Sequence, residues 1–356
     1  RDSIQESKIR DMNSFKNDYS EVSHPRIMQA LLDTNLDQTD GYGTDPHCER
    51  ARALIREKIA CPEADVHFLV GGTQANLTVV AAALRPYQAV VAAHTGHVCV
   101  HETGAIEATG HKVVSMPSPD GRLTPAMVEE ACGLHTDEHM VQPKMVYISD
   151  STEVGTLYRK AELEALHDTC RALGLYLFLD GARLSAALTA ETNDLSLPDL
   201  ARLCDVFYLG GTKCGALFGE AVVIVNDALK PDFRYLIKQR GGMLAKGRLL
   251  GIQFESLFED GLYLELGARA NRLGMRMKRA ISEAGFSFAS DSYTNQQFAV
   301  LPDALVEALG GHYKFERNGK PDAGHTVVRF VTSWATDETA VERFAADLRR
   351  LASGAE

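Results

Sequence analysis

Residues 206–215 read Val206-Phe207-Tyr208-Leu209-Gly210-Gly211-Thr212-Lys213-Cys214-Gly215. The apolar run at the start is typical of a buried strand, and the two glycines free the backbone where that strand ends. Lys213 then lies next to small residues, from where it can reach a pocket. A lysine in such a place can form a Schiff base, because burial and neighbouring cations lower the pKa of its amine. An isolated loop lysine is more often a solvated charge, so the rest of the chain has to decide its role.

The composition is that of a globular chain with a sizeable core. It has 356 residues, of which 45% are hydrophobic and 24% are charged, and this length predicts two domains. The net charge of -11 argues against nucleic acid or an anionic membrane surface as the main partner. No apolar run is long enough to span a bilayer, and the first residues lack the apolar core of a signal peptide, so we expect a cytoplasmic protein.

The seven cysteines are scattered and contain no Cys-x-x-Cys pair. Such spacing favours reduced thiols over a disulfide framework or a zinc site, and we expect no metal.

Short apolar runs alternate with helical patterns between about residues 50 and 240. Near-continuous apolar strands alternating with helices are typical of a parallel sheet covered on both faces. We therefore predict an α/β fold with a mainly parallel, seven-stranded sheet in a large domain at 46–250. The predicted strands are 66–70, 89–93, 113–116, 145–149, 175–179, 205–209 and 221–225, and the clearest helices are 74–84, 124–132 and 160–173.

The pattern changes after Gly251. A long helical stretch to about residue 283 precedes candidate strands at 298–301 and 327–331 and an amphipathic helix at 337–351. We predict a smaller α+β domain at 251–356. Residues 1–45 are predicted to form an N-terminal arm and interface segment, with a short helix at 25–32 and a second helix that Pro46 opens.

Polar groups follow three of the predicted strands, at the edge where ligands collect in an open parallel sheet. Gly72 and Thr73 open a helix whose free N–H groups can cradle a phosphate, although a plain N-cap would explain Thr73 equally well. Asp180 ends another strand, where a buried carboxylate needs a cation such as Arg183 or a protonated ring nitrogen. With Lys213, this is the set of groups that pyridoxal phosphate requires.

A fourth strand end carries histidines at 94, 97 and 101. They show no His-Glu-x-x-His arrangement that would indicate a metal site. A planar imidazole stacked on the cofactor ring fits better, and we assign that role to His97. The other two are more simply interpreted as solvated or capped histidines.

These motifs together resemble those of the fold-type-I pyridoxal-phosphate enzymes, most closely the low-specificity L-threonine aldolases of the beta-eliminating lyase group. The resemblance covers nearly the whole chain. It is carried by Tyr42-Gly43-Thr44-Asp45-Pro46, Gly72-Thr73-Gln74-Ala75-Asn76, His97 with Glu102 five positions later, Asp180-Gly181-Ala182-Arg183, Thr212-Lys213 and Val327-Val328-Arg329-Phe330-Val331.

The resemblance implies a role for each matching residue. Lys213 would hold the cofactor covalently, Asp180 would pair with the pyridine nitrogen, and His97 would stack on the ring. The phosphate would be held by Gly72 and Thr73. The substrate carboxylate would be bound by Arg183 and Arg329, because a guanidinium fork suits a carboxylate, with a hydroxyl from Ser20.

Relatives assemble as dimers of dimers with their sites at subunit interfaces. A homotetramer is therefore expected, in which Tyr42 and Lys246 can reach a neighbour's cofactor. The implied reaction is the retro-aldol cleavage of threonine or allo-threonine to glycine and acetaldehyde.

Some positions depart from the pattern. Where many relatives have an Asn-Thr-His run, this chain has Asp150-Ser151-Thr152-Glu153, and only His139 lies near the place of their substrate-hydroxyl histidine. The base for the hydroxyl proton stays open between His97, His139 and an ordered water. Beta-elimination and transamination use the same apparatus and remain alternatives, whereas a non-enzymatic scaffold would not need Asp180 and Lys213.

Overall fold

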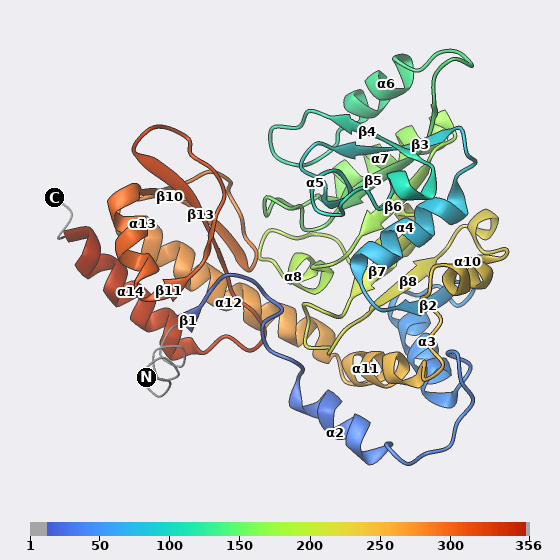
Figure 1. Ribbon diagram of the computed structural model, residues 1–356, viewed down its shortest axis with the longest axis horizontal. Coiled ribbons are helices and arrows are strands. Elements are labelled where there is room, and N and C mark those ends of the chain that lie inside the picture. Colours follow the sequence, from blue (N-terminus) through green and yellow to red (C-terminus); the bar gives the residue numbers. More distant parts are fainter. Residues whose placement is uncertain (1–12, 354–356) are drawn as a thin grey trace.

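Two units, one built on a seven-stranded sheet and one on a four-stranded sheet, lie side by side in the computed structural model (Figure 1). The structure describes residues 13–353, so residues 1–12 of the predicted arm lie outside the described residues. The long helix α12 (Leu262–Glu283) runs from one unit to the other. Its first turns contribute Leu262 and Leu266 to the core of the large unit, and its later turns contribute Met277 to the core of the small one.

The large sheet has the order β2-β8-β7-β6-β5-β3-β4. β8 runs antiparallel to both of its neighbours, and the other paired strands run parallel, so the prediction of a mainly parallel sheet is confirmed. All seven predicted strands are confirmed, although β5 begins earlier than predicted. The strands are β2 (Asp65–Leu69), β3 (Gln88–Ala93), β4 (Lys112–Met116), β5 (Gln142–Ser149), β6 (Tyr176–Asp180), β7 (Val206–Gly210) and β8 (Glu220–Ile224).

Successive side chains of each strand enter different cores, because strand side chains alternate between the two faces of a sheet. In β3, Val91 packs into one apolar cluster and Val90 into the other. In β6, Leu177 packs into the same cluster as Val91, and Phe178 packs into the same cluster as Val90. Both faces are therefore apolar, which is why these strands are near-continuous apolar runs in the sequence.

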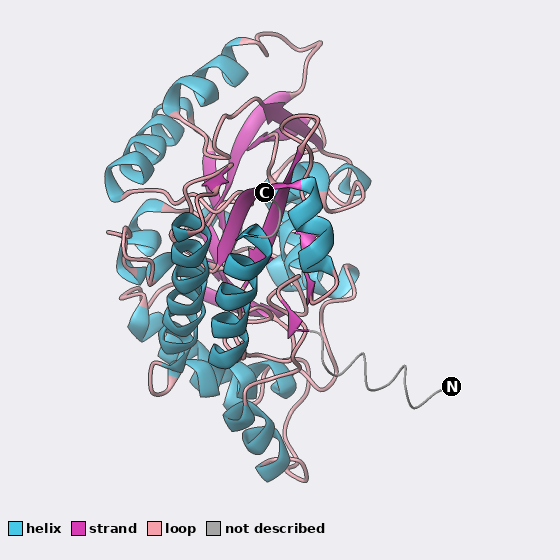
Figure 2. Cartoon of the chain, turned by 90° about the vertical axis from the view of Figure 1, so that its left-hand side faces the viewer, coloured by secondary structure: helices cyan, strands magenta, loops and turns pink. Residues whose placement is uncertain are grey.

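Helices enclose this sheet (Figure 2). One cluster is covered by α3, α6, α7, α9 and α11, and the other by α4 and α10. The helices predicted at 74–84, 124–132 and 160–173 are confirmed. The helices and turns of this unit are α3 (Pro46–Lys58), α4 (Gly72–Ala83), α5 (His97–Val100), η1 (Glu107–Thr109), α6 (Pro125–Gly133), α7 (Lys160–Leu173), α8 (Leu184–Leu188), α9 (Leu197–Leu203), η2 (Asp227–Leu229), α10 (Phe233–Gln239) and α11 (Arg248–Phe258).

The predicted long helix after Gly251 is two helices, α11 and α12. Gly261 separates them with a φ of 78°, a left-handed conformation that glycine adopts without the strain other residues incur. Phe254 of α11 is fully buried in the large core. The core of the large unit thus extends beyond residue 250, and the domain division at 250 stays a prediction.

The small unit has the strand order β12-β13-β10-β9 and packs on α12, α13 and α14. The two predicted strands are β10 and β13, which pair antiparallel, and the predicted last helix is α14. The short strands were not predicted, because two-residue strands have no readable periodicity. The elements are β9 (Ser287–Phe288), β10 (Gln296–Pro302), α13 (Asp303–Gly310), β11 (Tyr313–Lys314), β12 (Glu316–Arg317), β13 (His325–Val331) and α14 (Glu338–Ser353).

The N-terminal segment ties the two units together. β1 (Asn13–Ser14) pairs with β11 of the small unit, and Phe15 is buried in the small unit's core. A few residues on, the N–H of His24 donates to the Gly215 carbonyl beside Lys213, just before α2 (Pro25–Asp33). The segment between them therefore passes the edge of the large sheet where polar residues gather.

None of the helices in residues 13–353 combines the length and the apolar character needed to cross a membrane. All seven cysteines are unpaired thiols. Over the same described residues, no three His, Cys, Asp or Glu side chains come together in a way that could hold a metal ion.

Candidate active site

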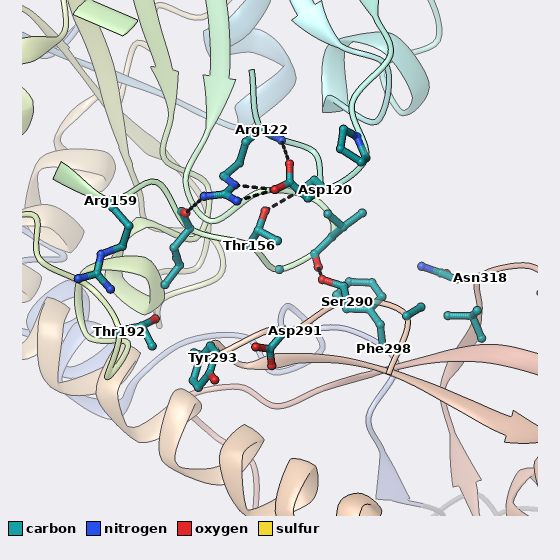
Figure 3. A pocket seen from close by; sticks show the side chains of 16 residues that line it. Asp120, Arg122, Thr156, Arg159, Thr192, Ser290, Asp291, Tyr293, Phe298 and Asn318 are labelled. Atoms are coloured by element: carbon teal, nitrogen blue, oxygen red, sulfur yellow. Dashed lines mark hydrogen bonds and ion pairs between the residues drawn. The ribbon is translucent and has the colours of Figure 1, made fainter. Parts of the chain in front are cut away.

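Two cavities of similar size are lined by both units. One of about 600 Å³ lies between the loop that holds Asp120 and Arg122 and the start of the small sheet at Ser290 (Figure 3). The other, of about 590 Å³, holds Lys213 and Asp180. We call the second one the lysine cavity and the first one the lateral cavity. Asn318 lines both, so the two cavities are neighbours.

Lys213 reaches the lysine cavity from the turn after β7. The turn is tight at Gly211, where an added Cβ would lie 2.8 Å from the Gly219 carbonyl oxygen. Within residues 13–353, the Lys213 amine has no hydrogen-bond or ion-pair partner. Burial and the charge of Arg183 lower the pKa of this amine. A lowered pKa favours the neutral, nucleophilic form that a Schiff-base lysine needs.

Asp180 ends β6 at the floor of the cavity and is 4% exposed. Three donors hold its carboxylate: the Tyr147 hydroxyl at 2.5 Å, the Ala182 N–H at 3.0 Å and the Asn76 amide at 3.1 Å. These three donors fix the orientation of the carboxyl group at the end of the strand. The arrangement suits a carboxylate that pairs with a protonated ring nitrogen.

His97 begins the short helix α5 and also lines the cavity. Its Nδ1 lies 2.7 Å from Glu102 Oε1, and the Asn76 amide donates to the same oxygen at 2.6 Å. One asparagine thus joins the support of His97 to that of Asp180. This fixes the plane of the imidazole, as a ring that stacks on a cofactor requires.

Gly72 and Thr73 form the first turn of α4, at the other side of the cavity. A Cβ added to Gly72 would lie 3.0 Å from the Tyr208 hydroxyl, so glycine keeps the space above this turn open. The first N–H groups of a helix have no partner within the helix and attract anions. The turn can therefore hold a phosphate.

Arg183 follows β6 and is paired with a residue that the sequence did not single out. Its Nε and Nη2 donate to the two carboxylate oxygens of Asp18, at 2.7 and 3.0 Å. Burial opposes the guanidinium charge, but the ion pair with Asp18 outweighs it and raises the pKa of Arg183. In the same way, burial would raise the pKa of Asp18, but Arg183 and Lys213 lower it.

Arg329 projects from β13 of the small unit into the same cavity. Its Nη2 lies 2.5 Å from Glu316 Oε2, while its Nε is buried without a partner among the described residues. Burial and the charge of Arg183 lower the pKa of Arg329. Two guanidinium groups from different units thus face one space, where a carboxylate ligand would relieve their repulsion.

Four predicted residues do not line this cavity. Ser20 is exposed and donates to Asn17 at 2.9 Å, and His139 is exposed on the loop after α6. Tyr42 and Lys246 are exposed as well, with the Tyr42 ring 5.0 Å from the Lys238 amine. The chain by itself therefore does not bring these four to the site.

Four acidic residues around the site were not assigned a role by the sequence: Asp18, Glu153, Glu220 and Glu316. Glu220 begins β8 and accepts from the Gly211 N–H at 3.0 Å and from the Thr212 hydroxyl at 2.9 Å. Burial raises its pKa, in spite of the nearby Lys213. The sequence does carry a signal for Glu220, because a glutamate is unusual at the start of an otherwise apolar strand.

The residues present fit pyridoxal phosphate. The cavity combines an anion site at α4, a supported carboxylate at Asp180, a fixed imidazole at His97 and an unpaired amine at Lys213. Each of these groups has a part to match in the cofactor: the phosphate, the pyridine nitrogen, the ring face and the aldehyde.

Comparisons with known proteins agree with this geometry. The model of the beta-eliminating lyase family matches residues 18–304. A low specificity L-threonine aldolase from Pseudomonas sp. (strain NCIMB 10558) is 33% identical over 92% of this chain and 95% of its own length. A solved structure of Leishmania major threonine aldolase is 50% identical, with a TM-score of 0.95 over 96% of this chain and 99% of that one.

A more distant structure, Thermus thermophilus aspartate aminotransferase, is 16% identical with a TM-score of 0.70 over 98% of this chain and 95% of its own. At this identity the likeness shows a shared fold alone. The comparisons together confirm the predicted fold class and pyridoxal phosphate as the cofactor.

Proposed function

Since the chain belongs to the beta-eliminating lyase family, we propose that it cleaves L-threonine and L-allo-threonine to glycine and acetaldehyde. The observation that carries this proposal is the meeting of Lys213, Asp180, Arg183 and Arg329 in one cavity. The 50% identity to a threonine aldolase structure supports threonine over other amino acids. Glycine formation and threonine breakdown are the metabolic roles that would follow.

Arg183 and Arg329 bind the substrate carboxylate. Nε and Nη2 of Arg183 donate to Asp18. Among residues 13–353, Nη1 of Arg183 has no such partner, so it can donate to a ligand. The Nε of Arg329 has no partner. Two guanidinium groups on different units fix the amino acid by its carboxylate and so orient the bonds at its Cα.

Pyridoxal phosphate supplies an electron sink for the bond that breaks at Cα. The residues of the chain would hold that group in place: Asp180 offers a carboxylate for the ring nitrogen, and His97 offers a ring whose plane Glu102 fixes. The amine of Lys213, whose pKa burial and Arg183 lower, would hold the cofactor covalently.

A product assay tests this function. The purified, cofactor-loaded protein is incubated with L-threonine or L-allo-threonine, and acetaldehyde is measured against ammonia and 2-oxo acid. We expect acetaldehyde and glycine in equal amounts. Ammonia or 2-oxo acid without acetaldehyde would replace the aldolase proposal by beta-elimination or transamination.

The proposed homotetramer rests on an exposed apolar segment at residues 22–36. Val22, Leu32 and Leu36 are exposed, Leu36 at 89%, and Figure 1 shows α2 of this segment at the rim of the large unit. A monomer gains nothing from such exposure, whereas a second copy would bury it. Light scattering measures the assembly, and L36E is expected to reduce its size.

Assembly would also give a role to residues that the single chain leaves outside. Tyr42 and Lys246 would reach a neighbour's cavity in the assembly, and Ser20 and His139 stay candidates for the substrate subsite. A cytoplasmic location is proposed from the acidic composition and the seven unpaired thiols.

A further inference from the structure

Glu153 lines the lysine cavity beyond the end of β5, beside the strand that ends in Asp180. It is half-buried, and neither the cofactor fit nor the carboxylate site uses it. A carboxyl group at this edge of the sheet is costly to desolvate unless a ligand or a partner compensates it. Its contacts indicate what kind of ligand that is.

Only one of its two carboxylate oxygens is anchored. Oε1 accepts from the His97 N–H at 3.0 Å and from the Ser149 hydroxyl at 2.7 Å. Within the described residues, Oε2 takes no hydrogen bond from any other residue. The two donors hold the carboxyl group in one orientation, which leaves Oε2 as the oxygen that can accept a proton from a ligand in the cavity.

The electrostatic surroundings make Glu153 a stronger base than an ordinary glutamate. Burial and the charge of Asp180 raise its pKa, although Ser149 and the His97 N–H partly oppose this. Its own charge in turn raises the pKa of Arg183 and of Tyr147. A base works best when its pKa approaches the working pH, so these surroundings suit proton transfer.

The histidines near the site are less well placed for that transfer. The ring of His97, held at Nδ1 by Glu102, is assigned to the face of the cofactor, and His139 lies on an exposed loop outside the cavity. His101 lines the cavity, and most of its surface is exposed. The part of it that is buried, together with the neighbouring His97, lowers its pKa. Among the described residues no hydrogen bond fixes its imidazole.

We propose that the Glu153 carboxylate accepts the proton of the substrate's β-hydroxyl group as the Cα–Cβ bond breaks. This inference rests on the proposed function. The O–H bond gives its proton to Oε2, and its electron pair forms the C=O bond of the departing aldehyde. The electron pair of the Cα–Cβ bond stays with the glycine fragment, so the step balances without an added oxidant or reductant.

The test compares E153Q with the wild type in three measurements. Glutamine keeps an oxygen that can accept from His97 and Ser149 but cannot take up a proton. We expect kcat for threonine cleavage to fall about 10²- to 10⁴-fold, the usual contribution of a general base. Exchange of the glycine α-proton in D₂O should persist, because glycine has no β-hydroxyl. Cofactor affinity, measured by absorbance titration, should also stay at the wild-type value.

Each other outcome counts against the proposal. Cleavage by E153Q at the wild-type rate would overturn it, and loss of all three properties would assign Glu153 to holding His97 instead. H101Q is measured beside it: loss of cleavage in H101Q, with E153Q active, would move the role to His101. If the wild type itself forms no aldehyde, the proposed function fails and this inference fails with it.

Discussion

The lysine cavity and the lateral cavity have nearly the same volume but different chemistry. Every charged side chain that lines the lateral cavity has an opposite charge beside it. Arg122 pairs with Asp120, as Figure 3 shows. Arg159 pairs with Asp194, and Asp291 pairs with Lys278. In the lysine cavity, Lys213 and Glu153 have no ion-pair partner in the described part of the chain.

The difference teaches that titratable groups without an ion-pair partner, and not cavity volume, mark the site. Burial of an unpaired charge costs free energy that a ligand can recover. The lateral cavity has no such cost to recover, because each of its charged side chains has an ion-pair partner. Substitutions in the lysine cavity should therefore lower activity or stability far more than substitutions in the lateral cavity.

The largest effect is expected for K213A. Without the amine there is no covalent attachment of the cofactor, and cleavage should fall roughly 10⁴-fold or more, as for removal of a covalent catalytic group. The measurement is the visible absorbance of the loaded protein before and after borohydride. A band that borohydride removes from K213A as from the wild type would show that another group holds the cofactor.

D180N is expected to cost less, about 10²- to 10³-fold in kcat, the range for loss of one preorganised electrostatic group. Asparagine has one acceptor oxygen and so can accept from either Tyr147 or Ala182 but not from both, and it has no charge to pair with a protonated ring nitrogen. Steady-state kinetics and cofactor titration are measured together. Unchanged kinetics would remove Asp180 from the site and weaken the contrast between the cavities.

D18N tests the one ion pair of the lysine cavity that is deeply buried. Its partners have side-chain exposures of 12% for Arg183 and 1% for Asp18. Removal of one partner leaves the other uncompensated, so we expect a loss of about 3–5 kcal/mol in the free energy of unfolding. The Arg183 guanidinium would also lose its orientation, which should raise KM for threonine more than it lowers kcat.

The pH dependence of this loss has a defined sign. The folded-state pKa of Asp18 is lowered, so its stabilisation is present above the unfolded value of about 3.9 and is lost as pH falls through the folded value. The difference in the free energy of unfolding between wild type and D18N should be largest at neutral pH and should become smaller below about pH 4. Urea unfolding at several pH values measures it. A gap that does not change with pH would show that the carboxylate charge contributes nothing.

The sequence predicted those features whose signal is local. The strands of the large sheet are apolar runs because both faces are buried, and Lys213 and Asp180 follow such runs directly. The Asp18–Arg183 pair joins residues 165 positions apart, and no periodicity in the chain predicts that contact. Glu153 was visible in the sequence only as a departure from the pattern of relatives, and its free oxygen depends on the positions of His97 and Ser149.

The smallest effect is expected for D291N in the lateral cavity. Asp291 pairs with Lys278 at 2.6 Å, but its side chain is 73% exposed, so solvent screens the pair and its loss should change the free energy of unfolding by less than about 1 kcal/mol. Threonine cleavage and cofactor affinity should equal those of the wild type, because Asp291 touches neither the lysine cavity nor its supports. Urea unfolding and steady-state kinetics of D291N serve as the matched control for D18N. A loss of cleavage in D291N would mean that the lateral cavity takes part in the reaction, and the distinction by unpaired charge would then be wrong.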